Sequence, residues 1–181
     1  MLDLAVTTAR SASDGVVVVV PAEDAAAEGG VAGGSTRAAS VRNGLAAVPP
    51  EATIVCVHDA ARPLASSELF ARVIAEVAAG ADGVVPAVTV TDTIKLVDDH
   101  GVVVDTPPRE RLVAVQTPQG FRATVLRRAH ATGMDGTDDA SLVERLGGRV
   151  MTVPGEAWNR KITTPDDLDR AREWLGRSAH A

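Results

Sequence analysis

The sequence predicts an α/β domain built on a mostly parallel, doubly wound sheet, and three observations support this prediction. Short runs of β-branched residues alternate along the chain with longer segments of helical periodicity. Apolar residues make up 45% of the chain and charged residues 23%, so enough surface can be buried to offset the entropy lost on folding. The length of 181 residues suits one domain with a single core, which we expect over residues 1–181.

Periodicity and end signals locate the elements of the first half. Every residue from 16 to 20 is valine, which is typical of a strand buried on both faces. Leu69, Val73, Ile74 and Val77 form the apolar stripe of an amphipathic helix. In order, we expect a helix at 2–12, a strand at 16–20, a Gly-rich loop at 29–34, a helix at 36–45, a strand at 54–58 and a helix at 66–79.

A hairpin interrupts this rhythm in the second half. Asp98-Asp99-His100-Gly101 is a turn-rich tetrapeptide between two β-prone runs. A two-stranded arm is marginally stable alone in water, so we expect the arm at 93–110 to pack on a second subunit. The other expected elements are strands at 83–88, 112–116 and 149–153 and helices at 122–131, 138–146 and 164–176.

Charge and composition exclude several classes of protein. The net charge is −6 and aromatic residues are 2% of the chain, which disfavours binding to nucleic acid by phosphate neutralisation or base stacking. An anionic ligand would have to meet a local cluster of cations. We expect no membrane span and no signal peptide, because the longest β-branched run stops at Pro21 and the N-terminus lacks a basic region before an apolar stretch. Cys56 is the only cysteine, which fits a cytoplasmic protein.

Two clusters in the first half follow predicted strands, at the sheet edge where α/β proteins bind ligands. The stretch from Gly33 to Arg37, with Ser40, offers backbone N–H groups, hydroxyls and a guanidinium at a helix start, which is either an anion site or a flexible loop with a helix cap. After the next strand comes His58-Asp59-Ala60-Ala61-Arg62-Pro63. Its carboxylate could hold a metal ion or a ribose, or Asp59 and Arg62 could simply pair across a turn.

Two further clusters lie in the second half. Thr91-Asp92-Thr93-Ile94-Lys95 is polar, and this pattern is also typical of a solvated edge strand. Thr137-Asp138-Asp139 could bind a ligand, although its local chemistry fits a helix cap better. Lys161 lies between two short β-like runs, where a half-buried lysine would need an anion nearby. Cys56 lies in an apolar strand and is interpreted as a core residue.

Seven segments carry a resemblance to a known family through their order along the chain. They are GGSTRAASVRNGL, VHDAARP, VTDTIK, PRERL, QTPQGF, TDDASLVE and NRKITTPDDL. Over nearly its whole length the sequence resembles the 2-C-methyl-D-erythritol 4-phosphate cytidylyltransferases. The resemblance implies a Rossmann-like nucleotidyltransferase sheet and a homodimer with interlocking hairpin arms. The implied reaction transfers a cytidylyl group from CTP to methylerythritol 4-phosphate with Mg²⁺, releasing pyrophosphate, in non-mevalonate isoprenoid biosynthesis.

The resemblance also implies roles for the matching residues, with no protein nucleophile. The nucleotide would be held by Gly34, Ser35, Ser40, Asp59 and Ala60, and Asp59 would also help to place Mg²⁺. The sugar phosphate would be met by Arg62, Thr93, Thr117 and Thr137. Catalysis would involve Lys161 facing the α-phosphate, Asp59, and Arg109, which would reach into the partner's site.

The sequence departs from the family pattern in three places. Members open with a strand and a loop of the form A-A-G-x-G-x-R, followed by P-K, which wraps the triphosphate. This sequence starts after that loop, so we expect an N-terminally truncated domain with an exposed strand edge and exposed apolar helix faces. Ser35 stands where many members have an acid, and Trp158 replaces a small or acidic residue. A ribitol 5-phosphate cytidylyltransferase and a catalytically dead dimerising or ligand-binding relative remain open alternatives.

Overall fold

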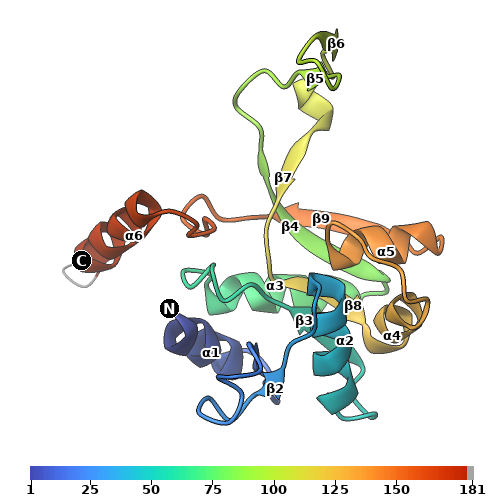
Figure 1. Cartoon of the computed structure of the whole chain (residues 1–181), viewed down its shortest axis with the longest axis vertical. Helices are drawn as coiled ribbons and strands as arrows, with labels where there is room; N and C mark the ends of the chain where they lie inside the picture. Colours follow the sequence, from blue (N-terminus) through green and yellow to red (C-terminus); the bar gives the residue numbers. More distant parts are fainter. Residues whose placement is uncertain (179–181) are drawn as a thin grey trace.

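The computed structural model describes residues 1–178, so the last three residues of the predicted domain lie outside the described part. The predicted α/β class is confirmed: helices pack on both sides of a central sheet (Figure 1). The helices are α1 (Leu2–Ser11), α2 (Arg37–Ala47), α3 (Ser67–Ala78), α4 (Ala123–Ala131), α5 (Asp139–Arg145) and α6 (Pro165–Ser178), with a 3₁₀ turn η1 (Arg109–Arg111). The strands are β1 (Val19–Val20), β2 (Val31–Ala32), β3 (Ile54–Val57), β4 (Gly83–Thr89), β5 (Leu96–Val97), β6 (Val103–Asp105), β7 (Val113–Val115), β8 (Gln119–Arg122) and β9 (Val150–Pro154).

Strand β4 is the centre of the main sheet. It pairs in parallel with β9 along its length, and antiparallel with β8 near its start and with β7 near its end. Strand β3 pairs antiparallel with the other edge of β8. Thus β3, β4 and β9 share the predicted common direction, whereas β7 and β8 oppose it. The reason is the arm: the chain leaves the body through β4, returns through β7 and continues into β8 without reversing.

Two predictions about strands were wrong. Of the predicted strand at 16–20, only Val19 and Val20 form β1, and they are half-buried because β1 pairs along one edge only. Its partner β2 lies within the stretch predicted to be a loop. A Cβ at Gly30 would lie 2.8 Å from the carbonyl oxygen of Val18, so glycine allows this close pairing.

Strand β8 was not predicted, because Gln119–Arg122 contains a glycine and no β-branched residue. The glycine has a packing role. A Cβ at Gly120 would lie 2.5 Å from Cγ1 of Val73 on α3. Glycine at this position therefore lets α3 pack closely against the sheet.

The core lies on both faces of the sheet. On one face α3 packs through Val73 and Val77 against Val84 and Val153. The other face is covered by α2, α4 and α5, which contribute buried residues that include Leu45, Leu126, Leu142 and Val143 around Phe121. Among the helices of residues 1–178, none combines the length and apolar character that a membrane crossing requires.

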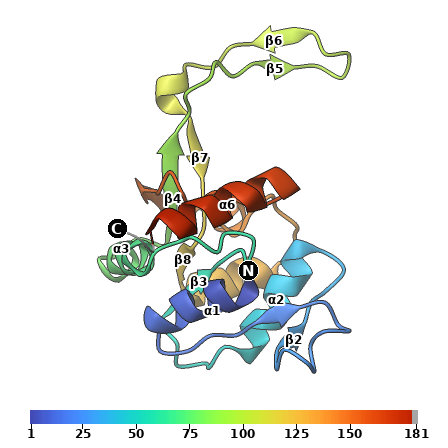
Figure 2. The same ribbon diagram turned by 90° about the vertical axis from the view of Figure 1, so that its left-hand side faces the viewer.

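The predicted hairpin is confirmed as an arm that projects from the body (Figure 2). Its turn is stabilised by Asp98, whose Oδ1 accepts hydrogen bonds from the amides of His100 and Val102 at 2.9 Å each. The arm and its stalk expose large apolar side chains: Ile94, Leu96, Val97, Val102, Val103, Val104, Val113 and Val115. A single chain leaves this apolar surface facing solvent.

Candidate functional site

The segment after β3 is held in a fixed turn by hydrogen bonds around one histidine. The amide of Asp59 donates to Oγ1 of Thr117 at 3.0 Å. The hydroxyl of Thr117 donates in turn to Nδ1 of His58, also at 3.0 Å. Nε2–H of His58 then donates to the carbonyl of Arg62 at 3.1 Å. Burial lowers the pKa of His58 to about 4, so the ring is neutral near pH 7 with one nitrogen accepting and the other donating.

Lys161 is brought next to this turn. The amide of Ile162 donates to the carbonyl of Ala61 at 2.8 Å, and Nζ of Lys161 lies 2.9 Å from Oδ2 of Asp59. The predicted anion near Lys161 is thus Asp59. The side chain of Lys161 is 50% exposed and that of Asp59 is 23% exposed. Because an exposed ion pair contributes only about 0–1 kcal/mol, Lys161 can exchange Asp59 for another anion at little cost.

The side chain of Arg62 forms no ion pair with Asp59, although its backbone amide donates to the carbonyl of Asp59 at 2.9 Å. Its Nη1 donates to the carbonyl of Asn159 at 2.8 Å and its Nη2 to the carbonyl of Val115 at 3.4 Å. The side chain therefore links the turn to two other segments of the site. The predicted contact between Arg62 and a sugar phosphate stays a prediction. The same holds for the predicted contact of Thr117, whose hydroxyl faces the turn.

A buried polar network behind this turn was not predicted. Gln116 and Glu156 exchange hydrogen bonds at 2.8 and 3.0 Å, and Nδ2 of Asn159 donates to the carbonyl of Thr117 at 2.9 Å. The carboxylate of Glu156 accepts from the amide and hydroxyl of Ser66 at the start of α3. This network positions the segment that carries Lys161. Its residues fall within or beside the family segments QTPQGF and NRKITTPDDL. Those segments were the only signal in the sequence that pointed to this network.

The predicted nucleotide loop precedes α2. The amide of Gly34 donates to Oγ of Ser40 at 3.0 Å, and that hydroxyl donates to the carbonyl of Thr36 at 3.0 Å. A Cβ at Gly34 would lie 2.4 Å from Cβ of Ala39, so the loop requires glycine here. Ser35 and Ala60 are exposed. The loop is thus held by Ser40 while its outer surface stays open.

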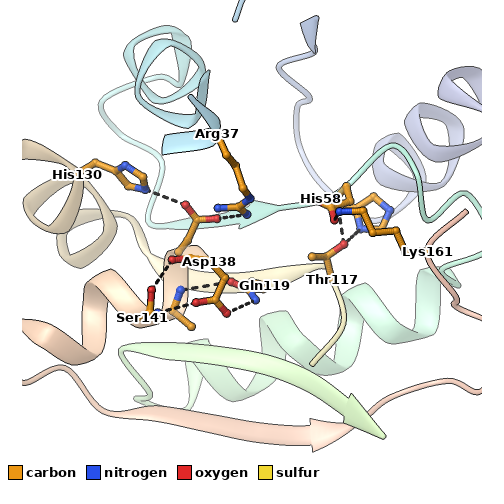
Figure 3. A network of polar contacts seen from close by, with 11 residues as sticks. Arg37, His58, Thr117, Gln119, His130, Asp138, Ser141 and Lys161 are labelled. Carbon is orange, nitrogen blue, oxygen red and sulfur yellow. Dashed lines mark hydrogen bonds and ion pairs between the residues drawn. The ribbon is translucent and has the colours of Figure 1, made fainter. Parts of the chain in front are cut away.

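An ionic cluster around a buried carboxylate ties the start of α2 to α5 (Figure 3). Nη2 of Arg37 lies 2.6 Å from Oδ2 of Asp139, and Nε2 of His130 lies 2.9 Å from Oδ1 of the same carboxylate. The Asp139 side chain is fully buried. Burial acts to raise its pKa, and its hydrogen bonds and charge interactions with His130 and Arg37 outweigh burial, so the pKa lies below its usual range. We call Arg37, Asp139 and His130 the Asp139 cluster.

The electrostatics of Arg37 connect this cluster with the turn after β3. Burial acts to lower the pKa of Arg37, and Asp139, with smaller contributions from the charges of Asp59 and Asp138, outweighs burial and raises it. Asp138 caps α5: Oδ1 accepts from the amide of Ser141 and Oδ2 from Nε2 of Gln119, both at 2.9 Å. The helix-cap interpretation of this acidic stretch is therefore confirmed. Thr137 is exposed beside the cap.

The structure does not bring Thr93 and Arg109 to Asp59 or Lys161 of the same chain through any contact within residues 1–178. Thr93 is exposed where the chain enters the arm. Nη1 of Arg109 donates to the carbonyl of Thr91 at 2.9 Å across the stalk. Both residues thus belong to the arm.

The arrangement suits an anionic ligand held by charge without a nucleophile. Burial raises the pKa of the Cys56 thiol to about 12, so Cys56 carries no thiolate near pH 7, in agreement with a core residue. Within residues 1–178 no three His, Cys, Asp or Glu side chains gather as a metal site. Asp59 offers a single hard carboxylate ligand, which fits a Mg²⁺ ion that takes its other ligands from phosphates and water.

Comparisons with known proteins agree with the geometry. Residues 2–177 match the family model of 2-C-methyl-D-erythritol 4-phosphate cytidylyltransferase. The chain is 52% identical to such an enzyme of Rhodococcus opacus over 93% of this chain and 78% of the relative, and 56% identical to that of Rhodococcus jostii over 83% and 66%.

Solved structures show the same fold. The cytidylyltransferase of Thermus thermophilus superposes with a TM-score of 0.84 at 39% identity, covering 97% of this chain and 88% of that one. The 4-diphosphocytidyl-2C-methyl-D-erythritol synthase of Anaerococcus prevotii gives 0.88 at 30% identity, covering 97% and 85%. The chain therefore belongs to the 2-C-methyl-D-erythritol 4-phosphate cytidylyltransferase family.

Proposed function

We propose that this chain transfers the cytidylyl group of CTP to 2-C-methyl-D-erythritol 4-phosphate at the Asp59–Lys161 pair, releasing pyrophosphate. The observation that carries the assignment to this pair is the exposed, exchangeable contact between Lys161 and Asp59 in a chain of the cytidylyltransferase family. In an acidic protein a local cation of this kind is where a triphosphate can bind.

The nucleotide would lie between the loop before α2 and the turn after β3. Gly34, Ser35 and Ser40 would hold the cytosine and ribose side, supported by the open surface of the loop that Ser40 fixes. Asp59 and Ala60 would contact the ribose. Exposed Ala60 has no side chain beyond Cβ to obstruct the approach.

The sugar phosphate would meet Arg62, Thr93 and Thr137. Thr117 would act through the turn, because its hydroxyl holds the amide of Asp59 and the ring of His58. Arg109 would reach the site of a second subunit, since it lies on the arm.

The reaction needs no covalent intermediate with the protein. A phosphate oxygen of methylerythritol 4-phosphate attacks the α-phosphorus of CTP, the bond to the β-phosphate bridging oxygen breaks, and pyrophosphate leaves with the electron pair. Lys161 would leave Asp59 and neutralise the charge that grows on the α-phosphate oxygens, while the loop and turn hold the reactants in line. Mg²⁺, held by Asp59 and the nucleotide phosphates, would supply further charge neutralisation.

The arm supports a homodimer. Its exposed valines, leucine and isoleucine form an apolar surface of a kind that monomers seldom leave in water. A second arm of the same sequence would bury it symmetrically. Sedimentation should show a dimer, and Val103→Asp should shift it toward monomer; an unchanged monomer in both cases contradicts this part of the proposal. The lone Cys56 supports a cytoplasmic location.

The test of the activity is pyrophosphate release with CTP, methylerythritol 4-phosphate and Mg²⁺. Release that needs both substrates, and that exceeds release with ribitol 5-phosphate, supports the proposal. Faster release with ribitol 5-phosphate would favour that polyol as substrate. No release from a chain with a cooperative unfolding transition would favour a ligand-binding relative without activity.

A further inference from the structure

A groove between α2 and α4 is lined by three residues that carry buried, unpartnered nitrogen atoms, which the proposed reaction does not use. They are Nη1 of Arg42, Nε of Arg127 and Nδ1 of His130, each buried and without a hydrogen-bond partner within residues 1–178. All three residues line the same groove of about 410 Å³. Of its lining residues only His130, a member of the Asp139 cluster, was described with the candidate site, and the proposed reaction does not use it.

Two of the three residues, Arg127 and His130, are held in place by contacts with the rest of the chain. Nη2 of Arg127 donates to the carbonyls of Val48 and Pro49 at 3.1 and 2.9 Å, which fixes its guanidinium against the chain after α2. His130 is 2% exposed, and its Nε2 faces Asp139. Nδ1 on the other side of the ring is the atom left over. Asp139 thus faces one nitrogen of the ring, and the two arginines line the same groove as His130.

The charges of the groove are all of one sign. No carboxylate lines it, and the remaining walls are apolar, as at Leu45 and Val48. Buried donors are nearly always satisfied in folded proteins, so donors that no described residue meets are suited to an acceptor on a ligand. Guanidinium groups favour phosphate and carboxylate oxygens as acceptors.

We propose that this groove binds the phosphate group of a small molecule through Arg42, Arg127 and His130. The bound phosphate accepts hydrogen bonds from the guanidinium groups of Arg42 and Arg127, whose side chains turn toward it because their unpartnered nitrogens are buried in the free chain, and from Nδ1 of His130 when that nitrogen carries a proton. The ligand thus contacts the Asp139 cluster directly, away from the proposed catalytic pair.

The test is calorimetric titration of the full chain with inorganic phosphate, at constant ionic strength adjusted with chloride. Arg42→Gln removes a groove cation, and Arg128→Gln is the matched control because Arg128 is the exposed neighbour of Arg127 and does not line the groove. The native chain and Arg128→Gln should bind phosphate equally. Arg42→Gln should weaken binding roughly tenfold, the effect expected for one charge-assisted hydrogen bond.

Two further variants test whether phosphate binds in the groove or at the proposed catalytic pair. Lys161→Gln should leave binding in the groove intact, whereas Ala131→Glu, at an exposed residue of the groove wall, should abolish it by charge repulsion. The proposal is overturned if the native chain does not bind phosphate, if Arg42→Gln binds as the native chain does, or if only Lys161→Gln loses binding. A crystal grown with phosphate that shows ordered water alone in the groove, or an adventitious ion only, overturns it as well.

Discussion

Two aspartates of this molecule pair with a cation and lie close to a histidine, yet their surroundings differ. Asp139 is fully buried and holds Arg37 at 2.6 Å and His130 at 2.9 Å. Asp59 is partly exposed and pairs with Lys161 at 2.9 Å, while the neighbouring His58 turns to Thr117 and Arg62 instead. The same pairing chemistry is thus structural where it is buried and exchangeable where it meets solvent.

The largest effect on stability is expected when the buried aspartate, Asp139, is removed. Asp139→Ala should lower the free energy of unfolding by about 3–5 kcal/mol, because the buried His130 and the partly exposed Arg37 would both lose their acceptor. Chemical denaturation followed by circular dichroism measures the change. A loss below about 1 kcal/mol would show that the cluster relaxes to solvent and is not a fixed support of α2.

Breaking the exposed pair of Lys161 and Asp59 should slow the reaction and leave the fold intact. Lys161→Ala should lower kcat on the order of 10² to 10³, by analogy with the removal of one donor to a developing negative charge. Its free energy of unfolding should change by no more than about 1 kcal/mol. Arg160→Ala, which removes the adjacent exposed cation, is the control and should keep nearly full kcat. Equal losses in both variants would mean that general positive charge, rather than Lys161, supports the reaction.

Titration should sharpen the comparison further. The pKa of His58 falls from 6.5 to about 4 on folding, so the unfolded chain binds the proton more tightly across that window. Stability should be fully present above pH 6.5 and decline by on the order of 3 kcal/mol as the pH falls toward 4. The lowered pKa of Asp139 acts in the same sense below 3.8, as its carboxylate is protonated. His58→Asn should flatten the decline between pH 6.5 and 4, and an unchanged slope would assign it to other groups.

The smallest effect is expected for an ion pair that is exposed to solvent and lies outside the candidate site. Asp169 and Arg172 on α6 lie 3.1 Å apart with side chains 70% and 68% exposed. Asp169→Ala should change the free energy of unfolding by less than about 1 kcal/mol and leave kcat unchanged. A larger loss would show that exposure is a poor guide to the strength of these pairs.

Local signals in the sequence predicted most helices and their starts. Thr36 and Ser66 accept hydrogen bonds from Ala39 and Leu69 as helix caps, and a capping side chain acts on residues three positions away, within reach of sequence reasoning. β8 escaped prediction because its stability comes from strands on both sides and from the fit of Gly120 against α3, which no local pattern reveals.

The candidate site shows the same division. Asp59 and Lys161 were each predicted from position and charge, but their pairing joins segments about a hundred residues apart and required the fold. Gln116, Glu156 and Asn159 went unassigned because polar residues of these types are mostly exposed, and only their mutual hydrogen bonds make them buried supports.

The way the arm joins the body has a mechanical consequence. β4 and β7 are paired up to Thr89 and Val113, whereas the stalk beyond them is joined by two side-chain hydrogen bonds, from Arg109 to the carbonyl of Thr91 and from Lys95 to Oγ1 of Thr106. We therefore expect bending to cost least at this stalk, which would act as a hinge between the body and the hairpin. The angle at that hinge sets where the arm can deliver Arg109.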